Sequence, residues 1–146
     1  MSNSADADAV FAAFLAALES VIAVDGARLE RTYSGHTDRA FAVSYAGRQL
    51  NVVAKVSQSD NGFWGLTDAR ARELVAEQGF LLLLHGIDSG YFISPKVFAR
   101  LLPKFSRTEK DNAVRINEGV VRAEARFRDL DELWEHLEPR FGPAAV

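Results

Sequence analysis

The segment Arg48–Leu66 constrains the fold most, because a strict alternation of side chains is followed by a strong turn signal. Successive side chains of a strand point to opposite faces of a sheet. One face carries Leu50, Val52, Ala54 and Val56, and the other carries Asn51, Val53, Lys55 and Ser57. Asn61-Gly62 strongly favours a tight hairpin turn, since both residues tolerate positive φ. We therefore predict a central hairpin in which Phe63–Leu66 returns against the alternating strand.

A helix and two further strands are predicted before this hairpin. Apolar side chains recur at three- and four-residue spacing over residues 5–23, which is the pattern of an amphipathic helix. Residues 28–33 and 39–45 alternate in type, and turn residues separate them from each other and from the central strand. Short strands with such connections predict an antiparallel meander.

Three later helices are predicted from their capping residues. Thr67 can cap a helix that runs to about Gln78, with Gly79 as the left-handed residue that ends it. Ser94 precedes Pro95, which is a favoured residue at the first helical position. Asp129 lies three residues before a glutamate, as in a capping box, and begins the last helix.

The remaining apolar patterns predict strands. Phe80–Leu84 is a continuous apolar run between glycines, which indicates a strand buried on both faces. Shorter strands are expected at 91–93 and 114–116, and the alternation over 121–128 predicts another. We expect a single α+β domain over residues 1–146, with a mixed, mainly antiparallel sheet flanked by helices.

The composition excludes several classes of function. The chain has no cysteine, which removes disulfides, thiol catalysis and zinc–thiolate sites. Its three histidines, His36, His85 and His136, lack the spacing of metal ligands. No Lys or Arg precedes Arg28, so the start lacks the basic region of a secretory signal, and no apolar run is long enough to span a bilayer. We expect a cytoplasmic protein that does not enter a membrane.

Glu19, Asp38 and Lys55 are the candidate catalytic residues. Clustered carboxylates hold a hard cation such as Mg²⁺, which polarises a phosphate and activates a bound water. The predicted order of elements over residues 6–93 resembles the restriction-endonuclease-like fold of the PD-(D/E)XK nucleases. That resemblance implies a divalent-metal site. Asp38 would be the acid near the second strand, Lys55 the lysine of the third strand, and Glu19 the acid of the first helix.

The chain departs from that family at one ligand. The family places an acid two residues before the lysine, and Val53 occupies that position. The resemblance therefore implies either a working nuclease or a non-cleaving member of the fold. Each candidate also has an ordinary structural interpretation. Lys55 can be an edge charge, Asp38 a turn residue and Glu19 a solvated helix residue.

A basic stretch supports a nucleic-acid-related function. Residues 96–128 hold nine basic and four acidic side chains, although the whole chain has a net charge of −3. The predicted nucleic-acid-binding set comprises Lys55, Trp64, Arg100, Lys104, Arg107 and Lys110. The cations would contact DNA phosphates, and Trp64 would stack on a base. Basic side chains also decorate ordinary solvated surfaces, and a tryptophan is commonly a core residue.

The acidic character of the chain supports a second hypothesis, a small intracellular protein-binding module such as an inhibitor, an immunity protein or an accessory subunit. Such a module would be non-catalytic and would present an acidic face to a basic partner. The face would lie on the N-terminal helix or on the last helix. The acids of the last helix are Asp129, Asp131, Glu132, Glu135 and Glu138.

Overall fold

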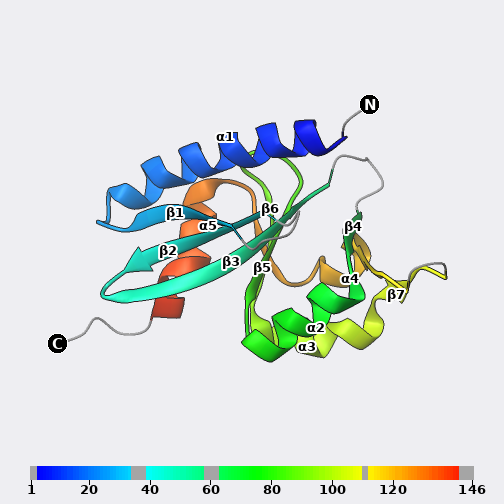
Figure 1. Ribbon diagram of the computed structural model, residues 1–146. Coiled ribbons are helices and arrows are strands. Elements are labelled where there is room, and N and C mark those ends of the chain that lie inside the picture. Colours follow the sequence, from blue (N-terminus) through cyan, green and yellow to red (C-terminus); the bar gives the residue numbers. More distant parts are fainter. Residues whose placement is uncertain (1–2, 34–38, 58–62, 110–111, 142–146) are drawn as a thin grey trace.

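The computed structural model describes residues 3–33, 39–57, 63–109 and 112–141 of the chain. Its elements are, in chain order, α1 (Asn3–Ala23), β1 (Arg28–Tyr33), β2 (Arg39–Tyr45), β3 (Arg48–Val56), β4 (Phe63–Leu66), α2 (Asp68–Glu77), β5 (Phe80–Leu84), β6 (Gly90–Ile93), α3 (Pro95–Leu101), η1 (Leu102–Lys104), β7 (Ser106–Arg107), β8 (Val114–Asn117), α4 (Glu118–Val121), β9 (Ala125–Phe127), α5 (Leu130–Leu137) and η2 (Glu138–Phe141). The fold is α+β, as the sequence predicts (Figure 1). Within the described ranges, no helix is long and apolar enough to cross a membrane.

A six-stranded sheet of order β1-β2-β3-β5-β6-β9 forms the centre of the fold. β1, β2 and β3 make the predicted antiparallel meander. β5 pairs with β3 in parallel, because β4 and α2 carry the chain across before β5 begins. β6 and β9 then add in antiparallel order at the far side. The sheet is therefore mixed and mainly antiparallel.

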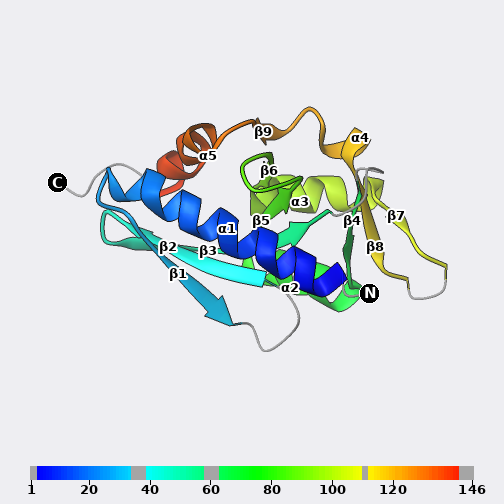
Figure 2. The same cartoon turned by 90° about the horizontal axis from the view of Figure 1, so that it is seen from above.

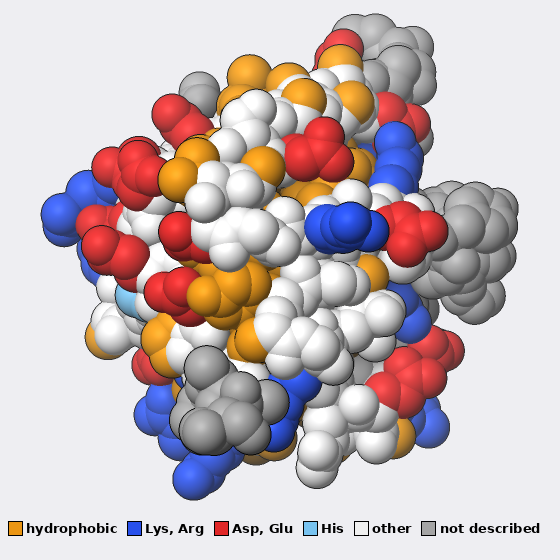
Figure 3. All heavy atoms as spheres, turned by 90° about the vertical axis from the view of Figure 1, so that its left-hand side faces the viewer, with side chains coloured by type: hydrophobic (Ala, Val, Ile, Leu, Met, Phe, Trp, Pro, Cys, Tyr) orange, Lys and Arg blue, Asp and Glu red, His pale blue; other side chains and the backbone are white. Residues whose placement is uncertain are grey.

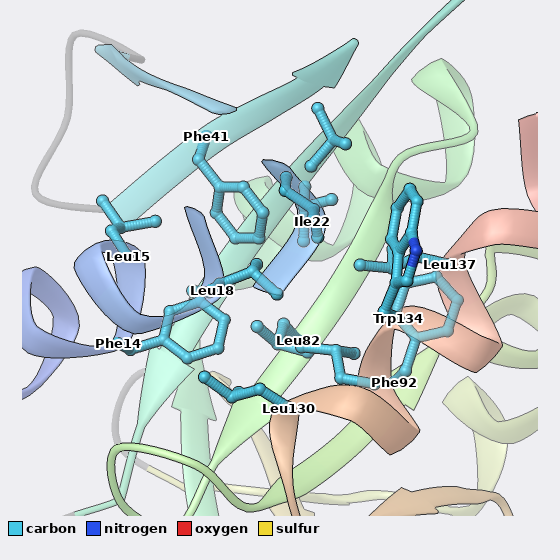
Figure 4. Packing of buried hydrophobic residues seen from close by; sticks show 14 of the residues in the cluster. Phe14, Leu15, Leu18, Ile22, Phe41, Leu82, Phe92, Leu130, Trp134 and Leu137 are labelled. Carbon is cyan, nitrogen blue, oxygen red and sulfur yellow. The ribbon is translucent and has the colours of Figure 1, made fainter. Parts of the chain in front are cut away.

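The first hydrophobic core lies on the sheet face that α1 and α5 cover. In Figure 4, side chains of α1 such as Phe14 and Leu18 point toward Phe41 of the sheet and toward Leu130 and Trp134 of the α5 segment. The face of β3 that the alternation predicts as apolar packs into this core. Burying such side chains stabilises the fold by roughly 1.5–3 kcal/mol each.

A second core lies on the opposite face of the same sheet. It joins α2, α3 and a small sheet of order β4-β8-β7 to β5 and β6. Figure 1 shows α1 above the strands of the main sheet and α2 and α3 below them, and in the view from above in Figure 2 the small sheet lies at the end away from α5. Leu81 and Leu83 of β5 point into this core, while Leu82 and Leu84 point into the first core. The prediction of a strand buried on both faces is thereby confirmed.

Side chains cap the three later helices as predicted. Thr67 and Ser94 each accept a hydrogen bond from the backbone N–H three residues further on. Asp129 does the same at the start of α5, where its carboxylate is 2.8 Å from the N–H of Glu132. The Glu132 carboxylate accepts in turn from the backbone N–H of Arg128 at 2.9 Å. Each such cap stabilises its helix by about 1 kcal/mol.

The predicted hairpin between β3 and β4 is wrong. β3 pairs with β2 and β5, whereas β4 leaves the main sheet and pairs with β8. The turn predicted at Asn61-Gly62 lies outside the described residues. The apolar side chains of Trp64 and Leu66 are buried in the second core, so burial rather than local turn chemistry decides the partner of β4.

Two local predictions also need correction. The alternation over 121–128 does not form one strand, since α4 ends at Val121 and only Ala125–Phe127 is extended. Val121 is buried in the second core and Phe127 in the first, so the chain must cross between the faces over these residues. At the end of α2, Gln78 rather than Gly79 takes the left-handed conformation, with φ of 54°.

We predict that Gly90→Ala destabilises the protein severely. A Cβ atom at Gly90 would lie 1.9 Å from the backbone oxygen of Leu83, and neither backbone can move without breaking the β5–β6 pairing. The expected loss in free energy of unfolding is about 3 kcal/mol or more, measured by urea denaturation. Gly86→Ala is the matched control, because its Cβ meets nothing within 4 Å. Equal stability of the two variants would contradict the prediction.

Candidate functional site

The structure does not bring Glu19 and Lys55 together. Glu19 is exposed on α1, which packs against the first core face. Lys55 lies two residues after Val53 on β3, and Val53 belongs to the second core. Since side chains two apart on a strand share a face, Lys55 points to the opposite side of the sheet from α1. β3 is also an interior strand, so Lys55 is not an edge charge.

The third residue of the predicted metal site, Asp38, lies outside the described residues. Among the residues that are described, no group of three or more His, Asp or Glu side chains is arranged to hold a metal ion. The divalent-metal site implied by the nuclease resemblance therefore stays a prediction.

Trp64 is a core residue. Its side chain is only 2 % exposed, and its indole N–H donates to the backbone oxygen of Leu84 at 3.0 Å. Its ring lies 4.9 Å from that of His85 and edge-on to Tyr91. These contacts leave the ring no open face on which a nucleic-acid base could stack.

Two of the predicted phosphate-contacting residues are already paired with acids of the chain. Arg100 pairs with Glu124 at 2.9 Å, and Arg107 pairs with Asp68 on α2. Asp68 also pairs with Arg72, and these two hydrogen-bonding guanidinium groups lower the pKa of its carboxyl group. Lys104 is exposed in η1, and Lys110 lies outside the described residues.

A polar cluster that the sequence did not reveal joins the small sheet to the main sheet. Glu118, at the start of α4, accepts hydrogen bonds from the Tyr91 hydroxyl at 2.9 Å and from His85 Nε2 at 2.5 Å. The hydrogen bond from His85 lowers the pKa of Glu118, while partial burial opposes that shift. Burial and the Glu118 carboxylate raise the pKa of Tyr91. The three residues come from separate elements, so no local pattern could have grouped them.

Two surface hollows carry mixed or positive charge. The larger, about 720 Å³, lies between α2 and the open side of the meander, where Arg70 is paired with Glu73 and Glu77 is exposed. Another, of about 510 Å³, lies beside α3 and is lined by Lys96 and Arg140. Neither hollow combines an apolar wall with lining charges that are all negative.

A third hollow lies between the C-terminal end of α1 and the start of α5. Its volume is about 490 Å³, and we call it the α1–α5 hollow. It is lined by Ser20, Val21, Val24, Asp25, Asp131 and Trp134. Val24 is 85 % exposed, which is the largest exposure of a big hydrophobic side chain in the described residues. The Trp134 indole N–H donates to the Asp25 carboxylate at 2.5 Å and joins the two helix ends.

The acids of α5 divide into two groups. Three of them make internal hydrogen bonds: Asp129 and Glu132 cap the helix, and Glu138 accepts from the Tyr45 hydroxyl at 3.1 Å. Asp131 and Glu135 are exposed and lie four residues apart, on one side of the helix. Figure 3 shows the face of the molecule that lies on the left of Figure 1. On the left of this view, acidic side chains gather beside exposed hydrophobic ones.

Comparisons with protein families, with characterised proteins and with solved structures find no match for this chain. The function is therefore inferred from the surface itself.

We predict that the Glu118 cluster makes stability depend on pH. A lowered pKa in the folded state means that Glu118 contributes stability above its unfolded pKa and loses it as the pH falls through its folded pKa. Unfolding in urea between neutral and acid pH should show a smaller loss of stability for Glu118→Gln than for the unmodified protein. Glu77→Gln removes an exposed carboxylate from α2 and should follow the unmodified protein. Identical profiles for all three proteins would contradict the prediction.

Proposed function

We propose that this chain is a non-catalytic protein-binding module that holds a basic partner at the α1–α5 hollow. The observation that carries the proposal is an exposed hollow with apolar lining side chains, in which Asp25 and Asp131 are the only charged lining residues among those that the structure describes. The hollow supports the sequence-based hypothesis of an acidic binding face. It also supplies a concave part of that face into which a partner side chain could fit.

The apolar part of the hollow supplies a driving force for binding. Val24 is almost fully exposed, and Val21 and Trp134 lie beside it in the same hollow. A single exposed valine is ordinary on a protein surface. Beside a hollow, an exposed valine can be covered by a partner side chain. The apolar area that this contact removes from water, at both surfaces, stabilises the complex by about 25 cal/mol per Å².

The charges of this face favour a positively charged partner. α1 is 21 residues long and has no basic residue in its last turn, so the negative end of its dipole is not compensated within the helix. Asp25 and Asp131 add negative charge close to that end. Like charges at an interface are costly, whereas complementary charges speed association.

The same charges do not suit a nucleic acid at this face, because its phosphates would meet carboxylates. The basic residues that could serve on another face include Arg100 and Arg107, and both pair with acids of the chain itself. A phosphate would have to displace those carboxylates. Protein binding is therefore the function that the described surface supports best.

We predict that partner capture depends on the exposed acids of α5. A photoreactive benzoylphenylalanine replaces Ser20 in the hollow, and adducts formed in the native cells are resolved by electrophoresis. Asp131→Asn/Glu135→Gln should strongly weaken a specific adduct, since it removes two negative charges from this face and leaves only Asp25 in the hollow. Glu30→Gln/Glu77→Gln removes the same charge from exposed positions on β1 and α2 and should preserve the adduct. Equal adducts from both double variants, or no specific adduct at all, would contradict the proposal.

A fluorescence-anisotropy titration with duplex DNA tests the alternative function, nucleic-acid binding. We expect negligible binding at about 50 mM salt, with or without Mg²⁺, since Arg100 and Arg107 are already paired with acids of the chain. Tight binding that weakens steeply toward about 200 mM salt and is lost in Arg100→Ala/Arg107→Ala would replace the present proposal with a DNA-binding function.

A further inference from the structure

We infer that the α1–α5 hollow binds a single arginine side chain of the partner. This inference rests on the proposed function and specifies the chemistry that the hollow recognises. An arginine combines an aliphatic stem with a planar, permanently charged head, so it needs an apolar wall and an acidic rim in the same place.

The apolar wall comes from the end of α1. Val21 and Val24 lie three residues apart and therefore share one side of the chain as the helix ends. Val24 is exposed, and Val21 is partly buried against the first core. The three methylene groups of an arginine stem can lie along these side chains while the head stays at the rim.

One of the two carboxylates of the acidic rim is held in place by the fold. The Asp25 Oδ2 atom accepts from the Trp134 indole N–H, which orients the carboxylate and leaves Oδ1 to accept from a ligand. Asp131 is exposed in the first turn of α5, on the other side of the hollow. A guanidinium group has five N–H donors in a rigid fork, so it can bridge two carboxylates where a lysine ammonium acts as a point charge.

One other feature favours a cation in this hollow. The end of α1 contributes the negative pole of a long helix, which stabilises a positive charge within the last turn.

The other two hollows lack this combination. Beside α3, Lys96 and Arg140 would repel an arginine head. In the hollow beside α2, Arg70 already pairs with Glu73, so a ligand cation would compete with a cation of the chain. Of these three hollows, the α1–α5 hollow is therefore the one at which we expect arginine to bind.

The two tryptophans allow a direct test by NMR. The indole N–H signal of Trp134 reports on the hollow, and that of Trp64, buried in the second core, is an internal control. Nα-acetyl-arginine amide is the probe. The Nα-acetyl amide of norleucine supplies a stem without the charged head, and guanidinium chloride supplies the head without the stem. We expect the arginine amide to shift the Trp134 signal in a saturable way and to leave the Trp64 signal in place.

Variants separate the contributions of wall and rim. Asp131→Asn and Val24→Ser should each weaken the response to the arginine amide by about three- to tenfold. Glu77→Gln and Val75→Ser make matched changes at exposed positions on α2, outside the hollow. Both variants should leave the response to the arginine amide unchanged. Equal responses to arginine and norleucine amides, or to arginine amide and guanidinium, would overturn the inference.

Other occupants give distinct results. A stronger response to the lysine amide would assign the hollow to lysine and overturn the choice of arginine. A shift of Trp134 that grows with protein concentration alone would identify a second copy of the chain as the occupant. If the Ser20 cross-link depends on the acids but the arginine amide does not bind, this inference fails and the protein-binding function stands. If the cross-link is also independent of the acids, both fail.

Discussion

The burial of β5 on both faces is the constraint on which the rest of the structure depends. Leu81 and Leu83 require one hydrophobic core, and Leu82 and Leu84 require another on the opposite face. Helices must therefore lie on both sides of the sheet, with α1 and α5 on one side and α2 and α3 on the other. This division decides which residues can meet. It places Glu19 and Lys55 on opposite sides and brings the ends of α1 and α5 together.

The meeting of α1 and α5 creates a surface that neither helix has alone. The apolar stripe of each helix is buried, so the residues left at their junction are those at the stripe's margin. Val24 remains exposed there, and Asp25 is held by the indole of Trp134. A partner that covers Val24 there can supply both apolar contact and a positive charge for the neighbouring carboxylates.

Local patterns predict most of the elements correctly, because alternation and capping act over a few residues. Thr67, Ser94 and Asp129 all cap the helices that the sequence assigns to them. The partner of β4 could not be predicted in the same way. Its turn signal is local, whereas the burial of Trp64 in the second core is decided by distant elements. The α1–α5 hollow could not be predicted from the sequence for the same reason, since Val24 and Trp134 are brought together only by the packing of the first and last helices.

Mapping the cross-link formed from position 20, which lines the α1–α5 hollow, tests directly whether this hollow binds a basic partner. Tandem mass spectrometry of the adduct identifies the residues of the partner that contact the photoreactive group. We expect one segment of a single protein, with an arginine at or next to the attachment point. Attachment to unrelated segments of many proteins, or to an acidic segment, would contradict the assignment of this hollow as a binding site for a basic partner.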